Sequence, residues 1–267
     1  MLVYLDLRNY KLKHIDMSKI MILGSQGSGK STSIGNIPEL NIKGLDPKET
    51  FIIACTNKGL PFKGWIKSYP RVKVKVKVGT SIITEISPTG NYYQTTDAMN
   101  VARLINLVNV TRKEIKNIVI DDSNYLMQDY YMANALKGGY DVFKKIGLFM
   151  GSVFNAIENV DIEKNVIMMA HYEEFKSKNS DTLSFRYKTV GKMVQDYITP
   201  EGKFEIVLFA TQEYDDQAKT VSKFFVTNYD GDFPSKSPVG MFDATHIPND
   251  LGFVVKRIHE YNTGSTE

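Results

Sequence analysis

A glycine-rich stretch near the amino terminus carries the clearest chemistry in the chain. Residues 24–32 read Gly-Ser-Gln-Gly-Ser-Gly-Lys-Ser-Thr and match the pattern GxxxxGK[ST]. They directly follow the apolar run from Ile20 to Leu23, and the segment from Ser31 predicts a short helix that ends at Pro38. Between a strand and a helix, this pattern is typical of a loop that cradles phosphate groups.

The residue types in this loop explain how it would hold a nucleotide. Glycines let the backbone amides turn toward the β-phosphate, and the amino terminus of the following helix adds partial positive charge. Lys30 neutralises the β and γ oxygens, and the Ser31 hydroxyl is a ligand for Mg²⁺. The alternative is a glycine-rich turn with an exposed lysine, which the motif and its context disfavour. The predicted nucleotide-binding residues are Gly24, Ser25, Gln26, Gly27, Ser28, Gly29, Lys30, Ser31 and Thr32.

Two adjacent carboxylates follow the apolar run Ile118 to Ile120. Asp121 ends this predicted strand, where it can hold Mg²⁺ through water, so the pair has the form of a Walker B motif. Adjacent residues of an extended strand point in opposite directions, so both carboxylates serve the nucleotide only if the chain turns after Asp121. Asp122 is then the candidate catalytic base that activates water. Taken alone, a helix cap or a turn is the commoner explanation of such a pair.

His171 follows the apolar run 166–170, and the segment after it interleaves aromatic and basic residues. At the carboxyl end of a strand the histidine can reach a γ-phosphate and report its loss, whereas an ordinary hydrogen-bonding role is the alternative. The spacing in 172–192 suits bases stacked on rings and phosphates held by cations. A solvated loop, or a DNA path over the three lysines of 72–78, is the alternative. The candidate DNA-binding residues are Lys176, Lys178, Phe185, Arg186, Tyr187, Lys188 and Lys192.

The elements that must position these residues alternate between strands and helices, which predicts an α/β fold with a mainly parallel central sheet. Short strands separated by Gly, Pro and Asp near the carboxyl terminus predict antiparallel strands that close one sheet edge. The strands are expected at 20–23, 51–55, 72–78, 118–120, 166–170, 204–210 and 224–227, and the longer helices at 97–110 and 142–157.

Three segments divide the chain. Residues 1–16 show no clear period, and Met17 is a second candidate start. Residues 1–18 form the predicted amino-terminal extension. Residues 19–261 form the predicted domain, and residues 262–267 are polar and predicted to form a flexible tail.

Composition narrows the classes of function. Hydrophobic residues make up 42% and charged residues 24%, which excludes a wholly disordered, collagenous or coiled-coil chain. Net charge is +3 and lysines outnumber arginines 27 to 6, so base-specific reading by arginine forks is disfavoured. The chain lacks a long apolar run and a leader pattern, so a cytoplasmic protein without a membrane partner is expected. Cys55 stands alone, which excludes a disulfide framework.

Several motifs together resemble one family. The chain is similar, from about residue 19 to residue 261, to phage-encoded RecA-like nucleotide-binding proteins, the short recombination ATPases of the Sak single-strand-annealing group. The phosphate loop is generic, whereas the stretches at 188–193 and 236–242 are the specific part. The motifs that carry the resemblance are the phosphate loop, Ile118–Asp122, Met168–Tyr172, Lys188–Met193, Lys236–Phe242 and Pro248–Leu251.

The resemblance implies an ASCE-type P-loop ATPase core that uses ATP and Mg²⁺, binds single-stranded DNA and assembles into rings or filaments in the host cytoplasm. A single-strand-binding protein is a further implied partner. RecA-like enzymes place a glutamate after the second core strand, but here Thr56-Asn57-Lys58 contains no acid. That departure shifts the catalytic role to Asp122 or puts hydrolysis in doubt. Lys188 or Lys236 would reach the γ-phosphate of a neighbouring subunit.

Three functions remain open on the sequence. The first is an ATPase that coats or anneals single strands in recombination or replication. A small-molecule phosphotransferase would share the loop, but it would need an arginine-lined second pocket, and the six arginines are scattered. A nucleotide-gated assembly protein with little turnover would explain the missing glutamate.

Overall fold

The computed structural model describes residues 18–137, 139–176 and 183–264. Most of the predicted extension, and the candidate Lys178, lie outside the described residues. Ser18 belongs to the body of the molecule, because it is buried and its amide donates to Asn165 Oδ1 at 3.0 Å.

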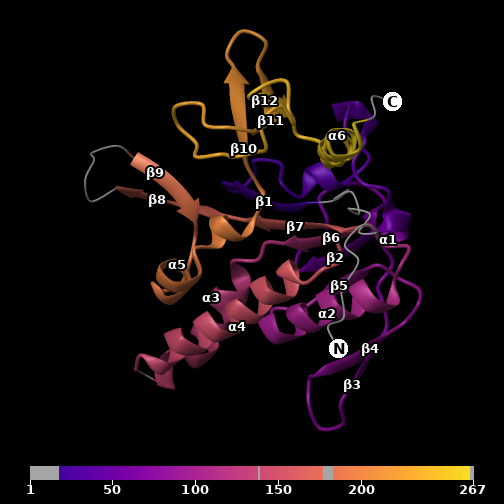
Figure 1. Cartoon of the computed structure of the whole chain (residues 1–267), viewed down its shortest axis with the longest axis vertical. Helices are drawn as coiled ribbons and strands as arrows, with labels where there is room; N and C mark the ends of the chain where they lie inside the picture. Colours follow the sequence, from indigo (N-terminus) through magenta and orange to yellow (C-terminus); the bar gives the residue numbers. More distant parts are fainter. Residues whose placement is uncertain (1–17, 138, 177–182, 265–267) are drawn as a thin grey trace, which may run out of the picture.

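A single large sheet forms the centre of the molecule (Figure 1). Six neighbouring strands, from β10 to β5, run parallel, and β11 and β12 add antiparallel pairings at one edge. Within the described residues the spatial order is β12 (His246–Pro248), β11 (Thr220–Val226), β10 (Ile206–Asp215), β1 (Lys19–Gly24), β7 (Asn165–Ala170), β6 (Asn117–Asp121), β2 (Thr50–Ala54) and β5 (Tyr92–Gln94).

The central strands are buried throughout and mainly apolar, because helices cover both faces of the sheet. In β1, Met21 and Leu23 belong to the core on one face, and Ile20 and Ile22 to the core on the other. The first core contains α2 and α4, whereas α6 packs into the second (Figure 1). The helices are α1 (Trp65–Ser68), α2 (Ala98–Thr111), α3 (Tyr125–Asn134), α4 (Asp141–Glu158), α5 (Met193–Ile198) and α6 (Leu251–Thr263).

Two hairpins project from this core. β3 (Val74–Val76) pairs with β4 (Ile83–Ile86), so the alternating valine–lysine stretch forms a short hairpin strand with exposed lysines. β8 (Tyr172–Lys176) pairs with β9 (Leu183–Tyr187) in the segment that directly follows β7. Both hairpins extend away from the main sheet (Figure 1).

The predicted helix after the glycine-rich loop is wrong. Only a single 3-10 turn, η2 (Thr32–Ile34), follows the loop. Gly35 then adopts an extended conformation, with φ −83° and ψ 154°, and Pro38 begins a separate 3-10 turn, η3 (Pro38–Leu40). Glycine readily leaves the helical region and the proline disfavours helix in the residue before it, so the helical pattern is broken after one turn.

The carboxyl-terminal part departs from the prediction in two places. β10 pairs parallel with β1, and only the β10–β11 and β11–β12 pairs are antiparallel. α6 continues to Thr263 and ends at Gly264, whose φ is 67°, so the helix passes the predicted boundary at 261. None of the helices in the described part of the chain combines the length and the apolar character needed to cross a bilayer.

Candidate functional site

The carboxyl ends of the parallel strands meet at a cavity of about 340 Å³. The loop after β1 forms one wall, and residues that follow β2, β6 and β7 form the others. Ligands of open α/β sheets bind at this edge. The lining residues are 26–32 of the loop together with Thr56, Lys58, Gly59, Pro61, Asp121, Asp122, His171 and Lys223.

The loop encloses its own lysine. Gly27 and Gly29 have φ values of 82° and 94°, a region in which only glycine is unstrained, so the backbone can wrap around a central point. Lys30 Nζ lies there and donates to the carbonyl oxygens of Gly24 and Ser25 at 2.7 and 2.9 Å. Burial lowers the pKa of Lys30 to about 8, against the opposing effect of nearby carboxylates. At neutral pH the lysine still supplies a positive charge.

Ser31 and Asp121 meet across the cavity, because the Ser31 hydroxyl donates to Asp121 Oδ1 at 2.9 Å. Burial, followed by repulsion from Asp122, raises the pKa of Asp121 to about 7. Hydroxyl and carboxylate oxygens are the ligands that Mg²⁺ prefers, and Mg²⁺ usually completes its shell with water and substrate phosphates. The pair therefore fits a magnesium ion that arrives with a nucleotide.

The chain turns at Asp122, as it must if the carboxylates of Asp121 and Asp122 are both to face the nucleotide. The φ of Asp122, 59°, is left-handed, which reverses the chain directly after β6 and keeps both carboxylates on the cavity. Asp122 Oδ1 lies 3.7 Å from His171 Nε2, and Oδ2 lies 3.9 Å from Lys58 Nζ. The side chain is thus placed between two groups that can carry positive charge.

His171 links the phosphate loop to Asn124, which lies between β6 and α3. Its Nδ1 lies 3.2 Å from the Gly24 carbonyl oxygen, and its backbone amide donates to Asn124 Oδ1. Burial lowers the pKa of His171, and the charge of Lys30 lowers it further, which favours the neutral form of the ring. A neutral imidazole beside a phosphate site can hydrogen bond in either direction without adding charge.

The β8–β9 hairpin is attached to the same site. The Lys188 amide donates to the His171 carbonyl oxygen at 3.0 Å, and Asn124 Nδ2 donates to the Lys188 carbonyl oxygen. At the other strand, a hydrogen bond joins Tyr172 to Ser25 of the loop. A shift of the loop or of His171 would consequently move the base of the hairpin.

The predicted stacking role of Tyr187 is wrong. This side chain is 0% exposed, packs against Phe154 and shares a hydrogen bond with Ser123 Oγ, so it has no free ring face. Phe185 is half-buried in an aromatic cluster with Tyr172, Phe209 and Phe233.

Of the basic residues predicted to bind DNA, one has a side chain that is paired within the protein, and the other described ones have exposed side chains. Arg186 pairs with Glu173 at 2.8 Å and lies over the ring of Phe175. Lys176, Lys188 and Lys192 are exposed. Lys236 is exposed too, and its backbone bridges to Val207 in β10, outside the cavity lining. The structure therefore brings the loop, Asp121, Asp122 and His171 together. Lys188 and Lys236 do not line the cavity, although the Lys188 backbone is hydrogen bonded to His171.

Sequence reasoning missed three residues at the site. Lys58 follows β2, and Lys223 lies on β11, more than 190 positions after the loop. Asn249 precedes α6, is 4% exposed and donates to the Ser28 carbonyl oxygen at 3.4 Å. The position of Lys58 after a strand was an available signal. Asn249 lies in the motif Pro248–Leu251, although no role was predicted for it, and nothing local marks Lys223.

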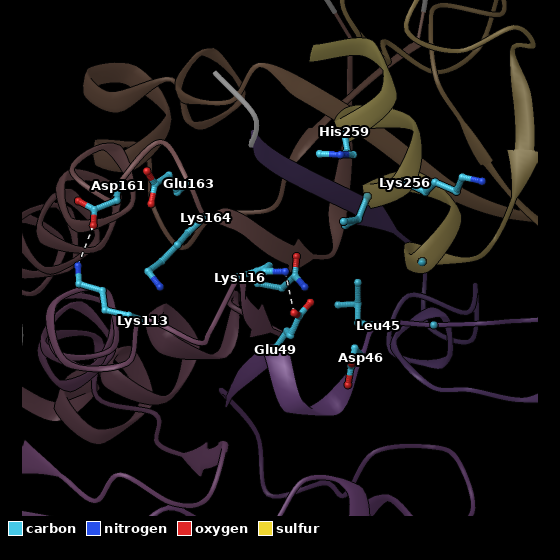
Figure 2. A pocket seen from close by; sticks show the side chains of 14 residues that line it. Leu45, Asp46, Glu49, Lys113, Lys116, Asp161, Glu163, Lys164, Lys256 and His259 are labelled. Atoms are coloured by element: carbon cyan, nitrogen blue, oxygen red, sulfur yellow. Dashed lines mark hydrogen bonds and ion pairs between the residues drawn. The ribbon is translucent and has the colours of Figure 1, made fainter. Parts of the chain in front are cut away.

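A larger cavity, of about 590 Å³, lies at the opposite edge of the sheet, beside the amino-terminal ends of β6 and β7. Figure 2 shows its charged lining. Lys113 pairs with Asp161 at 3.2 Å and Lys116 with Glu49 at 2.7 Å. Lys164 donates to backbone carbonyl oxygens, and Lys256 pairs with Glu260. Its four lysines are thus neutralised or satisfied by the protein itself.

The strand order defines the class of fold. β7 lies between the loop-bearing β1 and the Asp121-bearing β6, and β10 lies on the other side of β1. This is the RecA-like ASCE arrangement of a P-loop NTPase, with antiparallel strands added at the carboxyl-terminal edge. The chain therefore has a RecA-like P-loop fold.

Comparisons with known proteins add one structural likeness. The crystal structure of a KaiC-like protein from the hyperthermophilic archaeon Pyrococcus horikoshii OT3 is similar over 79% of each chain, at 12% sequence identity and a TM-score of 0.39. No protein-family model matches the chain, and no curated protein is similar to it in sequence.

Proposed function

We propose that the chain binds Mg-ATP in the loop-lined cavity and hydrolyses it, and that this cycle controls the binding of single-stranded DNA. One observation carries the nucleotide part. Lys30, Ser31 and Asp121 converge on a loop whose backbone amides are shaped for phosphate, at the ligand-binding edge of the sheet. ATP with Mg²⁺ is the ligand that this donor set fits.

The catalytic roles follow from placement. Lys30 and Lys58 supply positive charge that stabilises the oxygens of the transferred phosphoryl group. Asp122 accepts a proton from the attacking water, and His171 holds the turn beside it. Water then adds to the γ-phosphorus, the bond to the β,γ-bridging oxygen breaks, and ADP and phosphate are formed. Mg²⁺, when bound, neutralises phosphate charge through Ser31 and Asp121.

The DNA part of the proposal rests on the β8–β9 hairpin. Its backbone is hydrogen bonded to His171 and its first residue to the loop, so the nucleotide state can alter its position. Exposed Lys176, Lys188 and Lys192 lie on or after it. The resemblance to Sak-type recombination ATPases is what supports a role in recombination or replication in the host cytoplasm.

Assembly is the third part. Lys188 and Lys236 are exposed and do not line the cavity of their own chain, so a neighbouring copy is what they would reach. A ring or filament with ATP at the junctions fits that placement. We expect Mg-ATP to increase the assembly size measured by mass photometry. An unchanged mass in saturating Mg-ATP would contradict assembly.

A nucleotide-gated assembly protein with little turnover is the second candidate. The chain offers no carboxylate in Thr56-Asn57-Lys58, and it is Lys58 that enters the cavity there. ATP turnover measured with and without single-stranded DNA separates the candidates. DNA-stimulated turnover supports the first function, whereas ATP binding without turnover supports the second. Turnover only with a small phosphate acceptor would indicate a phosphotransferase and contradict both.

The DNA path has its own test. Replacing Lys176, Lys188 and Lys192 with Ala should reduce the salt dependence of single-strand binding by about 0.7 in log–log slope for each lysine that touches a DNA phosphate. The matched control replaces Lys73, Lys75 and Lys77, which are exposed at or beside β3. If only the control weakens DNA binding, the DNA crosses the β3–β4 hairpin and our assignment fails.

A further inference from the structure

The loop between β11 and β12 carries a braced apolar turn. Val239 is 95% exposed, and the Met241 amide donates to the Pro238 carbonyl oxygen at 3.1 Å, which closes the turn around it. Ser237 holds the base of the turn, because its amide donates to Asn228 Oδ1 and its hydroxyl accepts from Asn228 Nδ2. A single exposed valine is common, but here the backbone holds one out from the surface. We call the tip of this turn the Val239 knob.

A hollow of about 470 Å³ opens between the start of α2, α3 and α4. The Tyr130 and Phe149 rings meet edge to face in its wall, with centroids 5.1 Å apart. Two carboxylates, Asp97 and Asp129, belong to the lining, and no basic side chain lines it within the described part of the chain. Asp129 is exposed and forms no ion pair with a described residue. We call this cavity the α3 hollow, and its further apolar lining includes Met99 and Leu126.

The knob and the hollow lie at opposite ends of the sheet. The loop of the knob joins β11 to β12 and bridges to β10 through Lys236 and Val207. The hollow is lined mainly by residues that follow β5 and β6. Four strands separate β10 from β5, so at about 4.8 Å between neighbouring strands the two lie about 24 Å apart. A chain therefore cannot fill its own hollow with its own knob.

We propose that the Val239 knob of one copy enters the α3 hollow of the next copy, so that copies join head to tail. This inference rests on the proposed function, in which copies assemble with ATP at their junctions, and it specifies the two surfaces that meet. Insertion removes the valine and the apolar walls of the hollow from water. A contact between two different surfaces repeats from copy to copy, which builds a ring or a filament.

Charge and spacing favour the same contact. Lys236 is exposed, forms no ion pair with a described residue and precedes Val239 by three positions, a span of at most about 11 Å. The lysine therefore stays near the carboxylates of the hollow. The hollow also adjoins the phosphate cavity, because Lys58 of that cavity lies 5.4 Å from the ring centroid of Tyr125, which precedes Leu126. One loop can thus bring a lysine to the phosphate site of the next copy and a valine to its hollow.

Cysteine cross-linking tests which surfaces meet. Cys55 is 0% exposed, so a cysteine introduced at the surface is the reactive one. Chains with Val239→Cys are mixed in Mg-ATP with chains that carry Ala133→Cys, at an exposed position of the hollow, and a short bis-maleimide is added. We expect a cross-linked dimer in the mixture and none in either variant alone, because two different surfaces meet.

The other outcomes of this experiment are distinct. Cross-linking of Val239→Cys chains with themselves would overturn the inference, and so would a mixture that assembles without a cross-link, although the proposed assembly would then stand. Wild-type chains that stay monomeric in Mg-ATP would contradict the assembly and this contact together.

Substitution measures the strength of the contact. Val239→Asp brings a carboxylate among apolar walls and beside Asp129, so the protein concentration at half-assembly in Mg-ATP should rise about tenfold or more in analytical ultracentrifugation. Mg-ATP affinity of the monomer should be unchanged, because Val239 does not line the phosphate cavity. The matched control is Val78→Asp, at a valine that is 96% exposed between β3 and β4, and it should assemble as wild type does. Wild-type assembly of Val239→Asp would overturn the inference.

Discussion

The two charged cavities at opposite edges of the sheet differ in the residues and the backbone that surround their charges. The larger one, beside the amino-terminal ends of β6 and β7, has four lysines whose partners are carboxylates or backbone carbonyl oxygens of the same chain. The smaller one places two adjacent carboxylates beside Lys30, Lys58 and Lys223, and keeps a glycine-rich loop open to it. Size and number of charges therefore do not identify the ligand site.

What distinguishes the smaller cavity is strain and burial at groups that a ligand would use. Asp121 is held at a pKa of about 7 and Asp122 in a left-handed conformation, and both features cost folding free energy of the kind that is often retained at functional sites. At the larger cavity the ion pairs are half-exposed, so their contribution to stability is small. Changes at the two edges should consequently affect different measurements.

The largest effect is expected from Asp122→Asn. Asparagine tolerates the left-handed backbone, so the turn should persist, but it cannot accept the proton from water. ATP turnover in a phosphate-release assay should fall about 100-fold or more, with Mg-ATP affinity retained. Normal turnover in this variant would move the catalytic base elsewhere.

Lys30→Ala should weaken Mg-ATP binding about tenfold or more, which is about 1.4 kcal/mol, because the loop then lacks its central charge. Lys116→Ala is the matched control at the other edge of the sheet, where the lysine is paired with Glu49. Calorimetry on both variants measures the difference. An equal decrease in affinity in the two variants would mean that the cavities do not differ in their use of charge.

Asp121→Asn should remove the metal dependence of nucleotide binding. An amide has no charge to offer Mg²⁺, although its oxygen can still accept from Ser31. ATP affinity should become nearly the same with Mg²⁺ and with EDTA. A wild-type response to EDTA in this variant would remove Asp121 from the metal site.

The smallest effect is expected at the larger cavity. Hydrogen bonds from Lys113 and Asn109 lower the pKa of Asp161. Such a group stabilises the fold above its unfolded pKa of about 3.9, and the contribution is lost as pH falls through the lower folded value. Asp161→Asn should cost about 0.5 kcal/mol in urea unfolding at pH 7 and nothing at a pH below the folded value. Altered Mg-ATP affinity in this variant would show that the two edges are not independent.

Local patterns were sufficient for the parts of the site that lie next to a strand in the sequence. The loop after β1, Asp121 after β6 and His171 after β7 were all predictable, because parallel strands bring their carboxyl ends to one edge. Lys223 and Asn249 were not, because β11 and the start of α6 reach the loop only through the antiparallel edge of the sheet. No local period encodes that contact.

Two of the errors, the role of Tyr187 and the helix after the loop, have local causes. An interleaved run of aromatic and basic residues does not tell which side chains face the body of the molecule, and Tyr187, at the end of β9, turns toward Phe154 and Ser123. The helix predicted after the loop does not form because Gly35 is extended. The pattern of apolar residues predicts a helix there without taking this glycine into account.

That single turn after the loop also sets how the site behaves before a nucleotide arrives. Within it, Ser33 donates to the Gly29 carbonyl oxygen and Gly35 to that of Thr32. The first amides of any helical turn have no partner inside the turn, whatever its length. Phosphates that accept from those first amides would order the start of the turn. Nucleotide binding should therefore slow hydrogen exchange there, and deuterium uptake at the start of the turn would report it.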